Sequence, residues 1–454
     1  MKANNELRYL PPEGDIESKT VLKQLNKATR ALAELKAYAE VIPNKEILIS
    51  TIALQEAKAS SEIENIITTN DSLYKAMATT ESKIDANTKE VLQYREALWY
   101  GVKLIEEKEL ITTNMIIEIQ QILEGNRGGI RKLPGTALKN ALTGETVYTP
   151  PSGEELIRKL LANLEEYYNI PDDIDSLIKL AVTHYQFEAI HPFYDGNGRT
   201  GRILNILYLL KEGLLDSPIL YLSSYIIRNK KEYYEFLNKV TKDNDWESWI
   251  IYMLKAIEFT SKETLRTAKE IKNLIDATID FVKEKEPKIY SKELIEFIFK
   301  EVYLKANQLV DNGLSSRKTV VKYLKALEEI GVLQSEKVGR EVIYINTALF
   351  NLLKNSYIYK DQTNSETIET IKDKSFTPIN QTKSLSFGYS PNFNVWIKFT
   401  IHNSENEPIS KILEFDNSLV TNIALYENEL LINKEGLLNK KIDRKTVNPI
   451  FSIN

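Results

Sequence analysis

The sequence predicts a mainly α-helical protein with one small β-hairpin, then a winged-helix domain and a β-rich C-terminal tail. Three observations lead to this prediction. Apolar residues recur at helical spacing through much of the chain before Tyr290. After Tyr290, the order helix, turn, helix and alternating segment is typical of a winged helix. Beyond a polar linker at 361–370, β-forming residues dominate, and 395–401 is the clearest strand.

Helical periodicity predicts four helices in the first 120 residues, and Pro43 separates the first two. They cover Ser18–Ala39, Lys45–Ile63, Lys89–Glu107 and Thr113–Leu123. The N-terminus lacks a basic start followed by an apolar run, and no uncharged apolar run approaches about 20 residues. We therefore expect neither a signal peptide nor a membrane span, and take the cytoplasm as the default location.

Glycine marks the middle of the chain as the part with the most specialised backbone geometry. Ten of the 17 glycines fall between Gly125 and Gly213. Within this part, 136–140 and 146–149 flank a Thr143-Gly144 turn, which predicts a hairpin. Helices are predicted to follow at Glu154–Tyr168 and Asp175–Ala189.

The region after Tyr290 predicts the elements of a winged helix. They are a helix at Lys292–Lys300, a turn at 311–313, a helix at Ser315–Ile330 and an alternating segment, Val332–Ile345, around Gly339. Between residues 305 and 345, seven Lys/Arg stand against five Asp/Glu, which is a modest basic surface. DNA binding and a docking or dimerisation role are about equally compatible with this pattern.

The composition limits the available chemistry. The 454 residues suggest about three domains, and 43% hydrophobic residues can form ample cores. The net charge of −5 argues against a chain-wide surface for polyanions. The absence of cysteine excludes disulfides, cysteine-ligated metal centres and thiol nucleophiles. Any histidine chemistry must use His184, His191 or His402.

The string with the most chemical information runs from His191 to Arg202 and reads His-Pro-Phe-Tyr-Asp-Gly-Asn-Gly-Arg-Thr-Gly-Arg. Because proline disfavours helical geometry in the preceding residue, the helix before it should end at His191. The segment Gly196-Asn197-Gly198 can turn its N–H groups toward one anion. The apolar helix that begins there adds its positive N-terminal end, which favours phosphate.

Charged residues in this string suit a polyphosphate with a metal ion. Arg199 and Arg202 are three positions apart and share a helix face. Asp195 supplies one carboxylate, and Mg²⁺ with nucleotide phosphates commonly needs only one or two. His191 can act as a general base near neutral pH. A buried helix–loop–helix with capping glycines explains any one of these residues, but not the whole string.

The string resembles the signature of the Fic (Fic/Doc) family, His-Pro-Phe-x-(Asp/Glu)-Gly-Asn-Gly-Arg-x-x-Arg, without departure. That family transfers a nucleoside monophosphate, usually AMP from ATP, to a protein hydroxyl. The resemblance implies a Fic-fold helical bundle, ATP as the substrate and Mg²⁺ as the cofactor. It also implies that His191 takes the proton from a Ser, Thr or Tyr hydroxyl, and that Asp195 holds Mg²⁺ against the α- and β-phosphates.

The resemblance assigns the remaining residues of the string as well. Gly196, Asn197 and Gly198 would hold the α-phosphate, and Arg199 and Arg202 the β- and γ-phosphates. Phe193 would pack the loop onto the core.

Gly129-Ile130-Arg131, the predicted hairpin and Tyr148-Thr149-Pro150-Pro151 together resemble the family's flap. The flap would dock the target chain as an added strand through main-chain hydrogen bonds. The docking positions would be Thr136, Ala137, Leu138, Lys139 and Asn140. Aromatic residues after the core also match the family in position, but at this spacing we expect them to pack in the core. They are Tyr233, Tyr234, Trp246 and Trp249.

A second motif lies nearer the N-terminus. Ser60, Glu64 and Asn65 resemble the family's inhibitory motif, (Ser/Thr)-x-x-x-Glu-(Gly/Asn). The resemblance implies that Glu64 pairs with Arg202 and occupies the guanidinium that the γ-phosphate needs. Ser61-x-x-Glu64 also fits a capping box. However, apolar periodicity runs into this segment, so no new helix start is required here.

The other two histidines are predicted to be bystanders. His184 lies seven positions before His191, and a metal pair on one helix needs a spacing of four. We predict a packing or supporting role for His184 and a surface position for His402.

These inferences predict four domains. They are an N-terminal helical region with the inhibitory helix (1–110), the catalytic core (111–265), the winged helix (266–358) and a linker with a β-rich tail (359–454). The predicted function is a protein adenylyltransferase, autoinhibited by Glu64, that acts on the hydroxyl of a target protein. Self-modification, DNA and a homodimer are further expected partnerships. Two alternatives stay open: a hydrolase that removes AMP with the same site, and a DNA-binding regulator whose core senses ATP.

Overall fold

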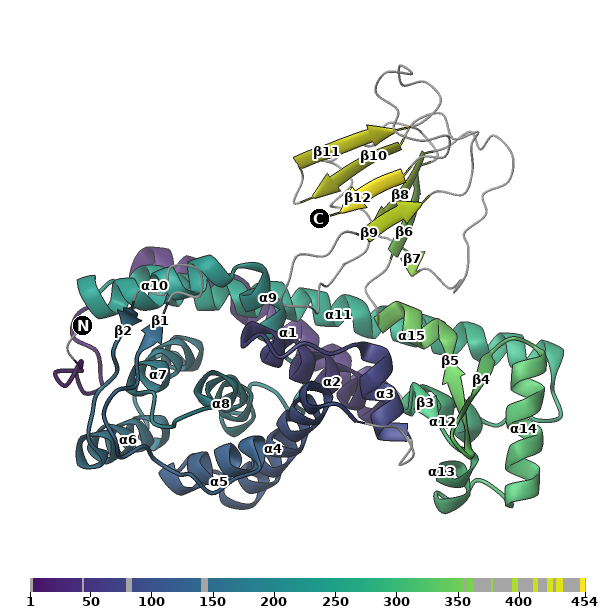
Figure 1. Cartoon of the computed structure of the whole chain (residues 1–454), viewed down its shortest axis with the longest axis horizontal. Coiled ribbons are helices and arrows are strands. Elements are labelled where there is room, and N and C mark those ends of the chain that lie inside the picture. The colour runs from purple at the N-terminus through teal and green to yellow at the C-terminus, as the bar shows by residue number, and fades with distance from the viewer. Residues whose placement is uncertain are drawn as a thin grey trace. The chain divides into compact units, whose positions relative to one another are not determined.

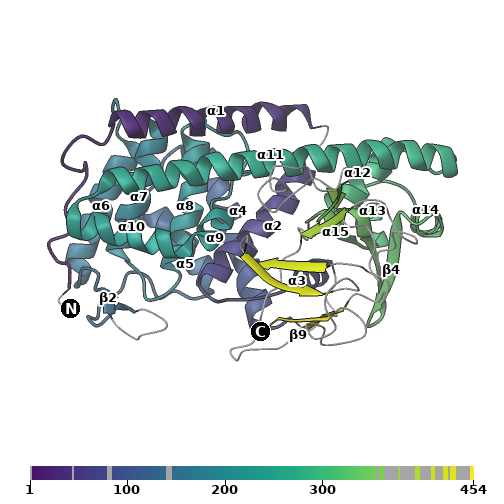
Figure 2. The same ribbon diagram turned by 90° about the horizontal axis from the view of Figure 1, so that it is seen from above.

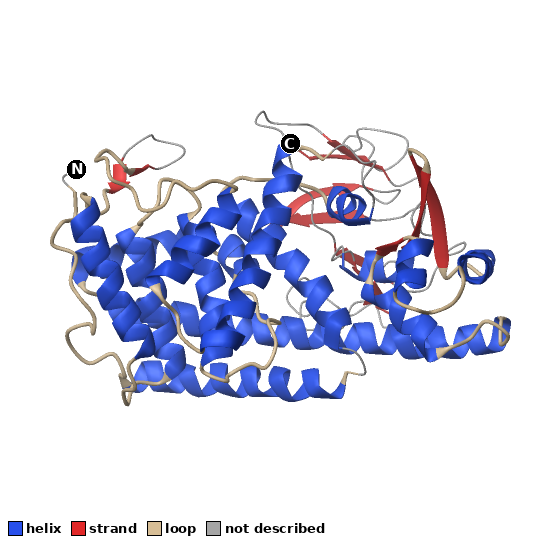
Figure 3. Cartoon of the chain, turned by 90° about the horizontal axis from the view of Figure 1, so that it is seen from below, coloured by secondary structure: helices blue, strands red, loops and turns tan. Residues whose placement is uncertain are grey.

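The computed structural model describes residues 3–42, 45–78, 84–139 and 146–353, and beyond them the backbone of seven short strands (Figure 1). The chain divides into two compact units, Met1–Phe350 and Asn351–Asn454. Helices make up most of the first unit, which confirms the predicted mainly α class (Figure 3). Within the described residues, no helix combines the length and apolar character that crossing a membrane requires.

Five helices form the N-terminal part of the first unit. They are α1 (Lys19–Val41), α2 (Lys45–Ile63), α3 (Asn70–Ala78), α4 (Ala86–Lys108) and α5 (Thr113–Glu124). The Ser18 hydroxyl caps α1 by accepting a hydrogen bond from the Val21 N–H, which satisfies one unpaired donor of the first turn. Four of these helices match the predicted positions, and α3 was not predicted.

The middle of the chain places two buried helices at the centre of the first unit. The hairpin strands β1 (Leu138–Lys139) and β2 (Thr146–Tyr148) are followed by α6 (Glu154–Asn169), α7 (Ser176–Ile190), α8 (Asn197–Lys211), α9 (Ser223–Arg228) and α10 (Lys230–Asp243). Most residues of α7 and α8 are buried, and in α8 these include the charged side chains of Arg199 and Arg202. Helix α8 contacts α4, α5 and α7 (Figure 1).

Helix α11 (Trp246–Lys285) is 40 residues long and lies beside α1 (Figure 2). One face of α11 buries apolar residues along most of its length, including Trp249, Ile257 and Ile275. The helix continues without a break across residues 265 and 266, where the sequence predicts a domain boundary.

A group of shorter elements follows α11. They are α12 (Lys292–Lys300), β3 (Tyr303–Leu304), α13 (Ala306–Asp311), α14 (Arg317–Glu329), β4 (Leu333–Val338), β5 (Glu341–Asn346) and α15 (Thr347–Leu353). The last of them, α15, begins in the first unit and ends beyond Phe350. The three strands form an antiparallel sheet in the order β3-β5-β4. Gly339 turns the chain between β4 and β5 with a φ of +59°. The winged-helix assignment of these elements stays a prediction.

The second unit contains seven described strands. They are β6 (Tyr357–Asp361), β7 (Thr377–Pro378), β8 (Asn394–Lys398), β9 (Lys411–Glu414), β10 (Ile423–Glu427), β11 (Leu430–Glu435) and β12 (Ile450–Ile453). They pair antiparallel in three groups, in the orders β7-β6-β8, β12-β9 and β10-β11. Strand β8 covers most of the segment that the sequence singled out at 395–401. His402 lies outside the described residues.

Candidate active site

The site is built on the turn between α7 and α8. Helix α7 ends at Ile190, and His191 follows it with a left-handed backbone (φ +48°). The His191 N–H still donates to the Phe187 carbonyl at 3.0 Å, which closes the last turn of the helix. Pro192 explains why the helix stops here, as the sequence predicts.

His191 is a neutral base in this position. Burial lowers the pKa of its imidazole to about 4, and the positive charge of Arg131 adds to the effect. Its Nδ1 atom is buried and has no hydrogen-bond partner among the described residues. At neutral pH the ring is therefore unprotonated and can accept a proton.

Asn197 holds the loop between the two helices in shape. Its side-chain Oδ1 accepts from the Phe193 N–H at 2.8 Å, and its Nδ2 donates to the Phe193 carbonyl at 2.9 Å. Phe193 is fully buried and packs near Phe187, with ring centroids 6.4 Å apart. Asn197 thus fixes the shape of the loop through its contact with Phe193, which the sequence did not predict. Its role in binding a phosphate stays a prediction.

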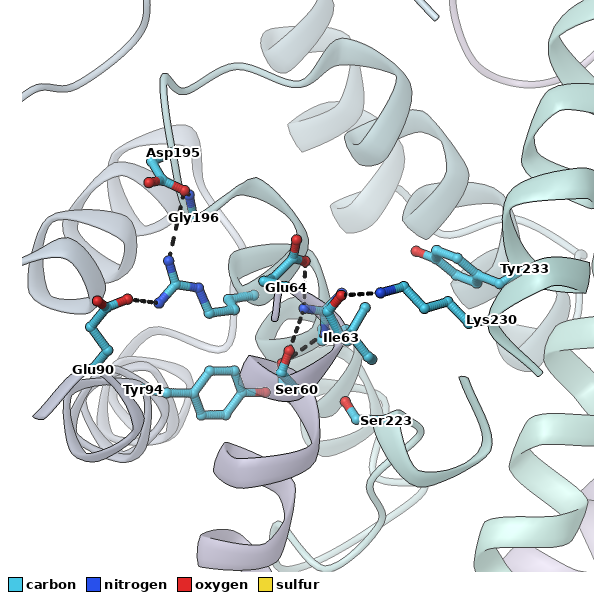
Figure 4. A network of polar contacts seen from close by, with 12 residues as sticks. Ser60, Ile63, Glu64, Glu90, Tyr94, Asp195, Gly196, Ser223, Lys230 and Tyr233 are labelled. Atoms are coloured by element: carbon cyan, nitrogen blue, oxygen red, sulfur yellow. Dashed lines mark hydrogen bonds and ion pairs between the residues drawn. The ribbon is translucent and has the colours of Figure 1, made fainter. Parts of the chain in front are cut away.

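Arg202 is buried, and its Nε and Nη2 atoms bond to residues at the end of α2. Its Nε donates to the Ser60 hydroxyl at 2.7 Å, and its Nη2 donates to the Ser60 carbonyl at 2.9 Å and to Glu64 Oε1 at 2.8 Å (Figure 4). Burial favours the neutral carboxyl of Glu64, but the Arg202 charge outweighs this effect, and the pKa of Glu64 is lowered. Asn65 follows with a left-handed backbone (φ +63°) that ends the helix.

Gly198 lies directly against this ion pair. A Cβ atom at this position would collide with Glu64 Oε1 and would stand 2.9 Å from Arg202 Nη1. The absence of a side chain at Gly198 is therefore what lets the Glu64 carboxylate reach the start of α8.

Arg199 is equally buried and pairs with carboxylates of two other helices. Its Nη1 lies 3.2 Å from Glu90 Oε2 of α4, and its Nη2 lies 2.9 Å from Glu124 Oε1 at the end of α5. Asp195 Oδ1 is 3.7 Å from the same Nη2 (Figure 4). Sequence reasoning missed Glu90 and Glu124, because no motif marks them.

Asp195 is the exposed carboxylate of the site. Its side chain is 79% exposed, and its Oδ1 accepts from the Gly196 N–H at 2.7 Å. Gly196 itself has a φ of +76°, which explains why glycine occupies the position. An accessible carboxylate oxygen beside the start of a helix matches the ligand chemistry of Mg²⁺, which takes one or two carboxylates together with phosphate oxygens. No group of three or more potential metal ligands occurs among the described residues.

His184 is a packing residue, as predicted. Its Nε2 lies 2.9 Å from the Tyr233 hydroxyl, and its ring stacks on Trp249 with centroids 6.0 Å apart. Burial lowers the pKa of His184 to about 3.

The aromatic residues after the core are mostly buried. Tyr233, Trp246 and Trp249 are buried, which confirms their expected place in the core. The expectation is wrong for Tyr234, which is 43% exposed and lies within the electrostatic influence of Glu64 and Arg202.

The flap is described in part. Leu138 and Lys139 form β1, and they pair with Tyr148 and Thr146 of β2. Thr136 and Ala137 lie immediately before β1 as non-regular chain, and Asn140 lies outside the described residues. A docking role for these positions stays a prediction.

Comparison with family models covers most of the chain. Residues 22–103 match the model described as "Fic/DOC family N-terminal", and residues 110–209 match "Fic/DOC family". The chain belongs to the Fic/DOC family. Residues 274–349 match "Protein adenylyltransferase SoFic-like, C-terminal domain", and residues 354–451 match "7TMR-DISM extracellular 2".

Individual relatives of this Fic protein are distant. A protein adenylyltransferase Fic of Nematostella vectensis is 28% identical over 193 residues, which are 40% of this chain and 42% of the relative. A probable protein adenylyltransferase of Aquifex aeolicus is 27% identical over 181 residues, 40% of this chain and 55% of the relative. The matches thus span about half the length of these relatives.

Solved structures of the family are similar at low identity. A Fic family protein of Desulfovibrio desulfuricans matches with a TM-score of 0.47 and 20% identity over 74% of this chain and 98% of that one. Fic-1 of C. elegans matches with a TM-score of 0.42 and 21% identity over 53% of this chain and 71% of that one.

Proposed function

We propose that this Fic protein is an adenylyltransferase that transfers AMP from ATP to a Ser, Thr or Tyr hydroxyl of a target protein. One observation carries the proposal. The neutral imidazole of His191 sits on the turn that leads into α8, and the first two turns of α8 present Arg199 and Arg202. A base, a helix N-terminus and two guanidinium groups are the parts that nucleotidyl transfer to a hydroxyl needs.

In the proposed reaction, the His191 imidazole takes the proton from the attacking hydroxyl. The hydroxyl oxygen forms a bond to the α-phosphorus, and the bond from the α-phosphorus to the oxygen bridging to the β-phosphate breaks. Pyrophosphate leaves, and AMP stays on the target. The N–H groups at the start of α8 would stabilise the charge on the α-phosphate, and Arg199 and Arg202 would hold the two outer phosphates.

The residues present also fit a metal ion. The exposed Asp195 carboxylate would hold Mg²⁺, and the ion, when bound, would neutralise charge on the α- and β-phosphates. A location in the cytoplasm would supply both ATP and Mg²⁺.

The same geometry supports autoinhibition by the end of α2. Ser60 and Glu64 together take up the Nε and Nη2 donors of Arg202. A γ-phosphate therefore has to displace Glu64 before Arg202 can bind it. We propose that this arrangement is the inhibited state of the protein. Asn65 would contribute to the inhibition, because α2 ends at a point where Glu64 faces α8.

The test compares wild type, Glu64→Gly and His191→Ala with ATP labelled at the α-phosphate, in the presence of cell lysate as a source of targets. We expect weak labelling of protein by the wild type, strong labelling by Glu64→Gly and none by His191→Ala. Absence of label with Glu64→Gly would refute the transferase. If Glu64→Gly instead lost the ability to remove AMP from a labelled protein, the site would be a hydrolase that uses Glu64 to align water.

A second, separate function is favoured by the surface of α14. Arg317, Lys318, Lys322 and Lys325 are exposed, and none of them forms an ion pair with a residue that the structure describes. We propose that these side chains contact the phosphates of DNA.

The test measures the shift in the electrophoretic mobility of DNA that binding causes, at several salt concentrations. The charge-reversed variant Lys318→Glu/Lys322→Glu should abolish this salt-dependent shift, whereas His191→Ala should leave it intact. A shift that survives the charge reversal would contradict this role. A homodimer and self-modification stay predictions.

A further inference from the structure

Arg131 makes contacts that are uncommon for a buried cation. The residue is 1% exposed, and its Nε donates to the His191 carbonyl at 2.7 Å. Its Nη2 donates to the carbonyls of Ile190 (3.2 Å) and Pro151. No carboxylate pairs with it among the described residues. Because burying an unpaired charge is costly, these contacts to backbone carbonyls have to offset that cost.

Two of these carbonyls, those of Ile190 and His191, lie at the end of α7, where a helix leaves its last C=O groups without internal partners. The Tyr148 hydroxyl donates to the Ala189 carbonyl at 2.8 Å, and Arg131 bonds the next two carbonyls. The Arg131 N–H donates to the Pro192 carbonyl at 2.9 Å. The flap, residues 129–151, thus bonds four successive carbonyls, 189 to 192. They belong to the segment 189–194, which joins the end of α7 to α8 and which we call the catalytic turn.

Tyr194 makes a second connection between the same two segments. Its hydroxyl accepts from the Lys132 N–H at 2.9 Å and from the Leu133 N–H at 3.2 Å. Tyr194 occupies the position between Phe193 and Asp195 that the Fic signature leaves open. This contact is therefore a feature of this chain's own sequence and does not follow from the signature.

We propose that Arg131 and Tyr194 are positioning residues that fix the base of the flap to the catalytic turn. The inference rests on the proposed transferase function, in which the flap docks the target and His191 takes its proton. The flap and the catalytic turn must then stay at a fixed distance from each other, because a displacement of about 1 Å can lower the rate of a reaction by about 10²-fold. The same bonds hold the left-handed backbone of His191, a conformation that is unfavourable for most residues other than glycine.

The kinetic test uses Tyr194→Phe, Arg131→Lys and Arg131→Met, each combined with Glu64→Gly. We expect kcat for transfer to fall about tenfold in Tyr194→Phe and further in Arg131→Met, with the KM for ATP unchanged, because the phosphate-binding residues are intact. Arg131→Lys should recover part of the loss. Tyr9→Phe is the matched control, because Tyr9 is also exposed and lies outside the flap and the catalytic turn.

Two further measurements do not depend on activity. Amide hydrogen exchange at Lys132 and Leu133 should rise in Tyr194→Phe, because both N–H groups lose their acceptor. In the otherwise wild-type chain, NMR titration should show a higher pKa for His191 in Arg131→Met, because Arg131 lowers it whereas Glu64 and Asp195 raise it. With only three histidines, the signal can be assigned by His191→Ala.

These measurements can fail separately for the proposed transferase function and for the positioning role of Arg131 and Tyr194. Faster exchange at Lys132 and Leu133 with an unchanged kcat would overturn the positioning role, and so would a loss that appears in the KM for ATP. If the Glu64→Gly parent itself transfers no AMP, the proposed function fails. The exchange and titration results still show in that case whether the two residues hold the turn.

Discussion

Arg199 is held by Glu90 and Glu124, which belong to helices that the signature does not include. In the proposed reaction, a phosphate that binds Arg199 would have to compete with these carboxylates, as it would with Glu64 at Arg202. The two guanidinium groups of the signature are therefore both occupied, one by the predicted inhibitory motif and the other by residues that have no motif.

Glu124→Gln, combined with Glu64→Gly, should lower the KM for ATP. Glutamine keeps the size of the side chain but removes the competing charge, so we expect roughly a threefold to tenfold decrease. Steady-state kinetics of AMP transfer measure the effect. Glu118→Gln is the control, because Glu118 lies on the same helix and bonds to Tyr100 instead. An increase in KM would mean that Glu124 orients Arg199 productively.

Glu56 introduces a pH dependence of stability. It is a buried residue of α2 whose Oε1 accepts from the hydroxyls of Tyr94 (3.1 Å) and Ser223. Burial raises its pKa to about 7, although Ser223 and Arg202 act in the opposite direction. The folded state thus binds the proton more tightly than the unfolded state, so stability falls as pH rises from about 4.5 to about 7 and stays lower above that range.

Glu56→Gln should therefore raise the melting temperature at pH 8 and change it little at pH 5. The expected gain in the free energy of unfolding at pH 8 is about 3 kcal/mol, since each unit of pKa is worth about 1.4 kcal/mol. Calorimetry between pH 5 and 8 measures it, with the exposed Glu96→Gln of α4 as control. Equal gains at both pH values would show that the effect is one of packing.

At the scale of elements, the end of α2 is held by a residue of α10. The Lys230 Nζ donates to the carbonyl of Ile63, the last residue of α2, at 2.6 Å (Figure 4). A cation at this end of a helix also interacts favourably with its dipole. Lys230 thus stabilises the turn that carries Glu64.

Lys230→Met should loosen this turn while leaving Glu64 in place. We expect faster amide exchange at residues 64–66 and a several-fold higher basal AMP transfer. Lys231→Met, at the exposed neighbouring position, is the control. Unchanged exchange at 64–66 would show that Lys230 does not hold the end of α2.

The sequence predicts those elements whose pattern is local. Helices α2 and α12 begin and end at the predicted residues. Pro43 lies just before α2, and α12 has an apolar stripe and a start that is capped by the Ser291 hydroxyl. Helix α3 was missed, since it is short and gains its stability from distant contacts. Its Tyr74 packs on Tyr303 and Phe350, with centroids 5.5 and 5.9 Å apart.

The same distinction applies to the site. Residues within a motif could be identified from the sequence, including the Glu64–Arg202 contact that the resemblance implies. Glu90 and Glu124 lie 109 and 75 positions from Arg199, and each reaches it only through the packing of α4 and α5 around α8. The spacing of residues along the sequence cannot predict such contacts.

At the scale of the whole molecule, the two units should be separable. The first unit holds the described site residues and a continuous apolar core. A chain that ends after Leu353, the last residue of α15, should keep a cooperative thermal transition with the midpoint of the full-length protein. Its Glu64→Gly form should still transfer AMP. Loss of the cooperative transition would show that the second unit is required for folding.

The left-handed backbone of His191 affects the choice of an inactive variant. Most side chains are strained there by about 1–2 kcal/mol, and asparagine is among the residues that tolerate the conformation best. His191→Asn should therefore abolish proton transfer without lowering the melting temperature. Such a variant would keep the docking surface in its native shape, and it could be used to capture the target protein in a stable complex.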